Sequence, residues 1–119
     1  MNVEHVHEIR EELRQPALNL RGEIPEVMRA FADLSRSAMA EGELSAGFKE
    51  LIALSIAATR ECDGCVAAHA RGAARTGMTR RQVAEAMGVV ILMNGGPGTV
   101  WGPRALQAFD EAVAERTES

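Results

Sequence analysis

Two cysteines and a histidine lie close together in the chain, and their types and spacing could do redox chemistry. Cys62 and Cys65 form a CxxC motif, and His69 follows four residues after the second cysteine. Residues three and four apart share one face of a helix, so Cys65 can meet both Cys62 and His69. A helix N-terminus favours the thiolate anion, and a CxxC pair there can close a small disulfide. The motif predicts a reactive dithiol, with His69 placed to exchange a proton with Cys65.

Glu50 is a fourth candidate, with eleven residues between it and Cys62. Most glutamates are solvated surface charges, but Glu50 lies in an otherwise apolar segment that a helix would bury. A carboxyl group buried beside thiols can accept and return protons during catalysis. We therefore expect Glu50 to act as a proton shuttle together with His69.

Other uses of a cysteine pair have to be weighed against redox chemistry. The two cysteines could be small buried hydrophobes, although polar Asp63 and flexible Gly64 between them are unlike core filler. All four candidate side chains are possible zinc ligands. Along a helix, however, Cys62 and His69 are about 10 Å apart, too far for easy convergence unless Cys62 lies off the helix. Covalent haem attachment fails because Val66 stands where CxxCH requires histidine.

The two cysteines are favoured as nucleophiles by different physical effects. The helix N-terminus stabilises the thiolate of Cys62 most strongly, whereas His69 lies one helical turn from Cys65. An imidazole within hydrogen-bond reach can stabilise a thiolate and also return a proton to the leaving group. We predict that Cys65 is the attacking thiol.

The composition limits the class of protein. The chain has 119 residues, which fits one domain, and its net charge of −4 without a basic block makes nucleic acid an unexpected partner. It is rich in alanine and only 3% aromatic, which favours helix over sheet. No apolar run approaches the roughly 18 residues of a membrane span, and no signal peptide pattern is present. We expect a cytoplasmic protein that does not bind membranes.

Helix caps and breakers divide the chain into about six helices, which predicts an all-α bundle. Asn2 should cap the first helix and Pro16 should end it, while a capping box at Thr79 and Gln82 starts the fifth. Pro103 should kink or start the last helix. The third helix is apolar on several sides and is expected to be central and buried. The cysteines lie in the first turn of the fourth helix, which is also expected to be central. The middle helices are expected at residues 25–42, 45–60, 63–77 and 79–93.

Two further features are given structural interpretations. His5 and His7 are not accompanied by an arrangement of acids or thiols that suggests catalysis, and they are expected at the surface. The run from Gly95 to Gly98 lacks the GxxxxGK[ST] pattern of a phosphate-binding loop. It is expected to form a sharp turn between helices.

Several motifs of the chain resemble those of one protein family. They are the spacing of Glu50, Cys62, Cys65 and His69, the run FKELIAL at residues 48–54 and the run GGP at residues 95–97. Together they are similar to the AhpD-like alkylhydroperoxidases of the carboxymuconolactone decarboxylase superfamily, over residues 25–115 of a single domain spanning 1–119. The resemblance implies hydroperoxide reduction with Cys65 as peroxidatic cysteine, Cys62 as resolving cysteine, and Glu50 and His69 in a proton relay.

The resemblance also implies partners and an assembly. Hydroperoxide is the substrate, the reductant is a dithiol, a lipoyl-type protein or a peroxiredoxin partner, and no metal, flavin or haem cofactor is required. Well-known peroxidase members carry histidine immediately before the second cysteine, where this chain has Gly64. Either Glu50 and His69 therefore suffice, or the physiological oxidant differs. The family forms homotrimers or homohexamers, and a chain similar to one unit of the duplicated members favours the hexamer.

Two other functions remain open at this point. In a lactone decarboxylase or related lyase, His69 and Glu50 would do acid and base work on a carboxylated substrate. The presence of both cysteines counts against this function, because such superfamily members generally lack them. In a non-enzymatic redox sensor, the disulfide would switch a partner interaction without peroxide turnover.

Overall fold

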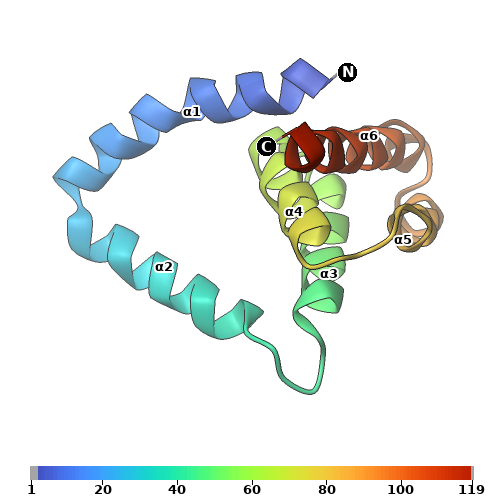
Figure 1. Ribbon diagram of the computed structural model, residues 1–119, viewed down its shortest axis with the longest axis horizontal. Helices are drawn as coiled ribbons and strands as arrows, with labels where there is room; N and C mark the ends of the chain where they lie inside the picture. The colour runs from blue at the N-terminus through green and yellow to red at the C-terminus, as the bar shows by residue number, and fades with distance from the viewer. Residues whose placement is uncertain (1–2, 119) are drawn as a thin grey trace.

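The structure, a computed structural model, describes residues 3–118 and folds this part of the chain into six α-helices without a strand (Figure 1). The helices are α1 (Val3–Glu23), α2 (Pro25–Met39), α3 (Ala46–Thr59), α4 (Asp63–Arg75), α5 (Arg80–Asn94) and α6 (Gly96–Glu118). The all-α fold predicted from the sequence is confirmed. None of these helices is long and apolar enough to cross a membrane.

Local capping signals explain where the middle helices begin and end. The Ser45 hydroxyl accepts a hydrogen bond from the Phe48 N–H at 3.1 Å and caps α3. At α5, Thr79 and Gln82 form both bonds of the predicted capping box. Gly77 follows the end of α4 with φ of 81°, a conformation that glycine adopts without steric cost. These boundaries therefore follow from the sequence.

The prediction for Pro16 is wrong, because α1 does not end there but continues to Glu23. Pro103 does not start the last helix either, because α6 begins at Gly96 with Pro103 inside it. A proline deprives the carbonyl four residues earlier of its donor. Because these segments are exposed, the carbonyls concerned can bind water instead. Asn2, the expected cap of α1, lies outside the described residues.

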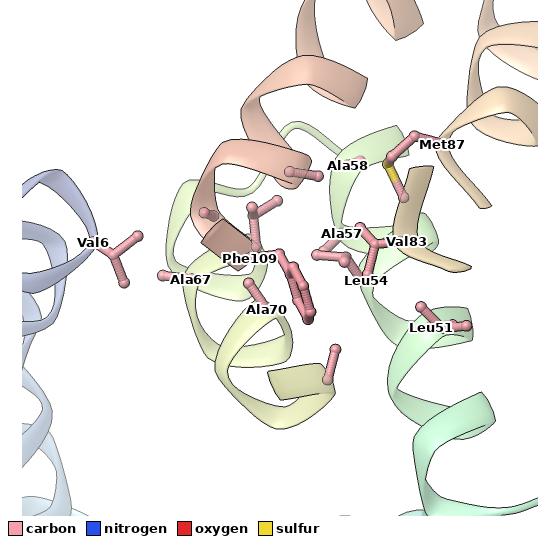
Figure 2. Close-up of a cluster of buried hydrophobic side chains, with 14 of the residues drawn as sticks. Val6, Leu51, Leu54, Ala57, Ala58, Ala67, Ala70, Val83, Met87 and Phe109 are labelled. Atoms are coloured by element: carbon pink, nitrogen blue, oxygen red, sulfur yellow. The ribbon is translucent and has the colours of Figure 1, made fainter. Parts of the chain in front are cut away.

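The hydrophobic core lies between α3, α4, α5 and α6 (Figure 2). Phe109 of α6 is buried with Leu54 of α3 and Val83 of α5, and alanines supply the buried faces of α4 and α6. Small side chains let these helices approach closely, which holds α4 in a fixed position. The buried alanines on these two helices are Ala67, Ala70, Ala73, Ala105, Ala108 and Ala112.

α3, which was expected to be central and buried, is buried on one side only within the single chain. Leu51 and Leu54 are buried, but Phe48, Ile52 and Ile56 are each about half exposed. They form a second apolar face, four residues apart along the helix, and this face has no cover in the described part of the chain. α3 therefore has one face in the core and another at the surface.

α1 and α2 form an arm, residues 3–39, that extends from the body made by α3–α6 (Figure 1). The arm is joined to the body near its N-terminal end, where Val6 and Ile9 are buried. The Val6 N–H donates to Glu111 Oε2 at 3.2 Å, and Arg10 pairs with Glu115 at 2.9 Å. α2 has no buried residue. Most of the arm therefore stands in solvent in the single chain.

Candidate functional site

The two cysteines lie at the start of α4. Cys62 is the N-cap residue, just outside the helix, and Cys65 lies in the first turn. Their sulfurs are joined in a disulfide with the Cα atoms 5.3 Å apart, and Cys62 Sγ accepts a hydrogen bond from the Cys65 N–H at 3.3 Å. Cys65 is exposed and Cys62 is half-buried. The pair is thus both close enough to bridge and open to a reactant in solution.

His69 and Glu50 form a hydrogen-bonded pair between α4 and α3. His69 Nδ1 and Glu50 Oε2 are 2.9 Å apart, and Nδ1–H donates when Glu50 is ionised. The Glu50 side chain is 8% exposed, and that of His69 is 33% exposed. Because the bond uses Nδ1, the Nε2 atom of the ring is left to exchange a proton with another group. His69 is one helical turn from Cys65, as expected from the spacing.

Two residues that the sequence analysis did not single out hold the Glu50 carboxylate. Gly72 lies on α4 directly against it, so that a Cβ atom at this position would come closer than 3.0 Å to the carboxyl carbon and both oxygens. Arg75 places a guanidinium nitrogen 3.6 Å from Glu50 Oε1. The sequence signal for the Gly72 contact is a glycine inside a predicted helix, because such a glycine can mark the close approach of another group to the backbone. The contact itself requires the packing of α3 on α4.

The loop of the disulfide borders a cavity of about 410 Å³ between α1, α4 and α6. Asp63, which lies between the cysteines in sequence, is part of its wall, as are Trp101 and Arg104, whose guanidinium stacks over the Trp101 ring at 4.8 Å. The remaining wall is mostly apolar, formed by Val6, Ile9, Val66, Ala67 and Ala108 with Glu61. The cavity can hold a small organic molecule next to the loop of the disulfide.

Gly64 also has a neighbour that bears on its function. A Cβ atom at this position would lie 2.9 Å from Leu13 Cδ1 of α1. α1 therefore covers the position at which the well-known peroxidases carry histidine. A larger side chain at this position would have to displace Leu13, so the packing of α1 on α4 favours glycine here.

The other candidate features have structural explanations. His7 is exposed, as expected, and His5 lies outside the side chains that the structure describes. The expected turn between α5 and α6 is made by Gly95 alone, with φ of 67°, whereas the rest of the run, Gly96 to Gly98, already belongs to the first turn of α6. Asp110 accepts two hydrogen bonds from Arg80, raises the pKa of that guanidinium and joins the start of α5 to α6. Among residues 3–118 no three histidine, cysteine or carboxylate side chains cluster to hold a metal ion.

This all-helical chain with a CxxC pair and a glutamate–histidine pair belongs to the carboxymuconolactone decarboxylase family, whose model matches residues 25–112. An uncharacterized protein of Cupriavidus necator is 42% identical over 86 residues, which are 72% of this chain and 76% of that protein. "Uncharacterized protein 4 in cox locus" of Paracoccus denitrificans is 37% identical over 82 residues, or 69% and 74% of the two chains. The superfamily resemblance is therefore confirmed.

A solved structure matches the fold as well as the sequence. It is the apo form of lpg0406, a carboxymuconolactone decarboxylase family protein from Legionella pneumophila. The two structures superpose with a TM-score of 0.88 at 31% identity, over 92% of this chain and 97% of that one. The match extends into the arm, because the body made by α3–α6 accounts for a smaller share of the chain than the 92% that is matched. The chain therefore has the fold of its family over nearly its whole length.

Proposed function

We propose that the protein is a thiol-dependent peroxidase that reduces hydroperoxides through the Cys62–Cys65 pair. One observation carries the proposal: the two cysteines are bridged at the start of α4, one turn from a histidine that is hydrogen-bonded to a buried glutamate. A pair that bridges without rearrangement can cycle between dithiol and disulfide. The bridged form corresponds to the oxidised end of that cycle.

In the proposed reaction, the Cys65 thiolate attacks one peroxide oxygen. A sulfur–oxygen bond forms and the oxygen–oxygen bond breaks, so the cysteine is oxidised to a sulfenic acid and the hydroperoxide is reduced to an alkoxide. His69 supplies the proton that converts the alkoxide to an alcohol, and Glu50 orients the imidazole and balances its charge. Cys62 then attacks the sulfenic sulfur, and water leaves as the disulfide forms.

Reduction of the disulfide requires two electrons and two protons from a dithiol donor. A lipoyl-type protein or a peroxiredoxin partner is the proposed donor, and a cytoplasmic setting suits the cycle because dithiols are kept reduced there. The large apolar side chains at the surface of α2 and α3 support a homotrimer or homohexamer. The hydroperoxide would bind in the cavity beside Asp63, whose apolar wall suits an organic substituent.

A lyase acting on a carboxylated substrate is the second candidate, and one observation favours it. Arg10, Arg71, Arg75 and Arg116 line a cavity of about 340 Å³ that also contains Glu115. Arg75 connects this cavity to the Glu50–His69 pair. Guanidinium groups bind carboxylates well, so an acid and base pair next to them could serve such a substrate without using the thiols.

Stopped-flow oxidation of the fully reduced protein distinguishes these functions. The protein is mixed with cumene hydroperoxide or with hydrogen peroxide, and free thiols are counted after each reaction time. The peroxidase proposal expects the loss of two thiols per chain with either oxidant and, with cumene hydroperoxide, one cumyl alcohol formed per disulfide. Thiols that survive excess hydroperoxide would contradict the proposal and leave the lyase. A disulfide that forms without repeated turnover in the presence of a dithiol would indicate a redox sensor.

A further inference from the structure

Arginines from three helices line the cavity of about 340 Å³ that contains Glu115. Arg71 and Arg75 belong to α4, Arg10 to α1 and Arg116 to α6. Four of the 13 basic residues of a chain with a net charge of −4 are therefore gathered around one space, which we call the arginine cavity. Positive charge is concentrated there against the net charge of the whole chain.

The carboxylates near the arginine cavity do not balance its charge. Glu115 is the one acidic residue among the described residues that line it, and it is shared by Arg10 at 2.9 Å and Arg71 at 3.9 Å. Glu50, outside the lining, lies 3.6 Å from a third guanidinium. Even when buried Glu111, one turn before Glu115 on α6, is counted, four guanidinium groups are matched by three carboxylates. An excess of positive charge therefore remains.

Ordinary helix electrostatics explains only part of this cluster. Arg75 and Arg116 lie in the last turns of α4 and α6, where the helix C-terminus favours a cation. Arg10 and Arg71 lie further inside α1 and α4, where this effect fades. An arginine side chain does not release its proton in proteins, so the repulsion between these groups persists until an anion offsets it.

We propose that the arginine cavity binds a phosphate group, either as inorganic phosphate or as a phosphomonoester. A phosphate group carries up to two negative charges and presents at least three acceptor oxygens in a tetrahedral arrangement. A carboxylate carries one charge and presents two oxygens in one plane. Guanidinium groups that come from three helices around one space match the phosphate better, because more of them can bond to it at once.

The size and openness of the cavity suit a small ligand. Its volume lies at the lower end of the roughly 300–1,000 Å³ of small-molecule sites. The side chains of Arg10 and Arg71 are 38% and 41% exposed, so a ligand in solution can reach them. Arg75 also contacts Glu50, which places the bound phosphate next to the glutamate–histidine pair. Binding uses neither thiol, so the inference does not rest on the proposed function.

Isothermal titration calorimetry of the oxidised chain tests the site, with inorganic phosphate and phenyl phosphate as probes at constant ionic strength. We expect saturable binding at one site per chain with a Kd of about 1 mM or tighter. Arg71→Gln should weaken binding at least about ten-fold, because it removes a charged donor. Glu115→Gln should tighten it, because it removes a negative charge from the cavity. Arg81→Gln, 84% exposed and outside the lining, is the matched control and should bind as the wild type does.

The outcomes separate the possible ligands. Tighter binding of phenyl phosphate than of inorganic phosphate would identify a phosphomonoester, and the reverse order would identify the free ion. Malonate that binds as tightly as phosphate would overturn the inference in favour of carboxylates. The inference also fails if no saturable binding is seen, or if Arg71→Gln, with the circular dichroism of the wild type, keeps its affinity. A negative peroxidase assay would leave these results unaffected.

Discussion

Gly72→Ala tests whether the buried carboxylate of Glu50 is held where the structure has it. The new methyl group would come closer than 3.0 Å to the carboxyl carbon and both oxygens. Both helices are fixed by the core, so the side chain of Glu50 has to move rather than the backbone. Its hydrogen bond to His69 Nδ1 should then be lost. The substitution thus perturbs the proposed relay of Glu50 and His69 without changing either residue.

Two opposing contributions set the size of the effect on stability. Replacing glycine by alanine inside a helix stabilises by about 1 kcal/mol. Losing a hydrogen bond to a charged group costs about 1.5–3 kcal/mol. Gly88→Ala is the matched control, because Gly88 lies inside α5 and a Cβ there meets nothing within 4 Å. The free energies of unfolding of the two variants should therefore differ by about 1.5–3 kcal/mol, with Gly72→Ala the less stable.

Urea unfolding of the oxidised variants at one protomer concentration measures this difference, and thiol oxidation by cumene hydroperoxide measures the effect on the relay. Gly72→Ala should oxidise more slowly than wild type, because His69 loses the group that orients it. Gly88→Ala should oxidise at the wild-type rate. The reasoning is refuted if Gly72→Ala is stabilised as much as Gly88→Ala and oxidises as fast as the wild type.

Further predictions concern the relay and the bridge. Glu50→Gln and His69→Ala should slow thiol oxidation, by about 10²-fold or more for the histidine, while both thiols remain countable; unchanged rates in stopped flow would exclude the relay. Oxidation should consume two thiols per chain and give an intrachain bridge between Cys62 and Cys65, seen as a monomer band on a non-reducing gel. Interchain dimers on that gel would contradict this pairing.

Sequence reasoning was most accurate where the relevant forces are local. The capping box at Thr79 depends on a few neighbouring residues and was predicted. The expected helix limits at residues 45 and 77 likewise agree with the cap at Ser45 and with Gly77 after α4. The effect of Pro16 was not, because a helix can tolerate a proline where water replaces the lost donor. Local patterns therefore fix most helix boundaries in this chain.

The candidate site was predictable only in part, for a related physical reason. The spacing of Cys65 and His69 follows from helix geometry, and Glu50 was expected as their partner. The roles of Gly72 and Arg75 depend on how α3 packs against α4, which no local pattern encodes. The apolar residues on several sides of α3 indicate burial, but no local pattern says which of its faces is buried within one chain.

The central claim is that Cys65 attacks the hydroperoxide with the help of His69. Trapping with dimedone followed by mass spectrometry tests it most directly, using Cys62→Ser and Cys65→Ser after one equivalent of cumene hydroperoxide. Cys62→Ser should carry the adduct on Cys65, because the sulfenic acid has no second thiol to resolve it. Cys65→Ser should carry little or none. An adduct on Cys62 in Cys65→Ser, with Cys65 unlabelled in the other variant, would contradict the account.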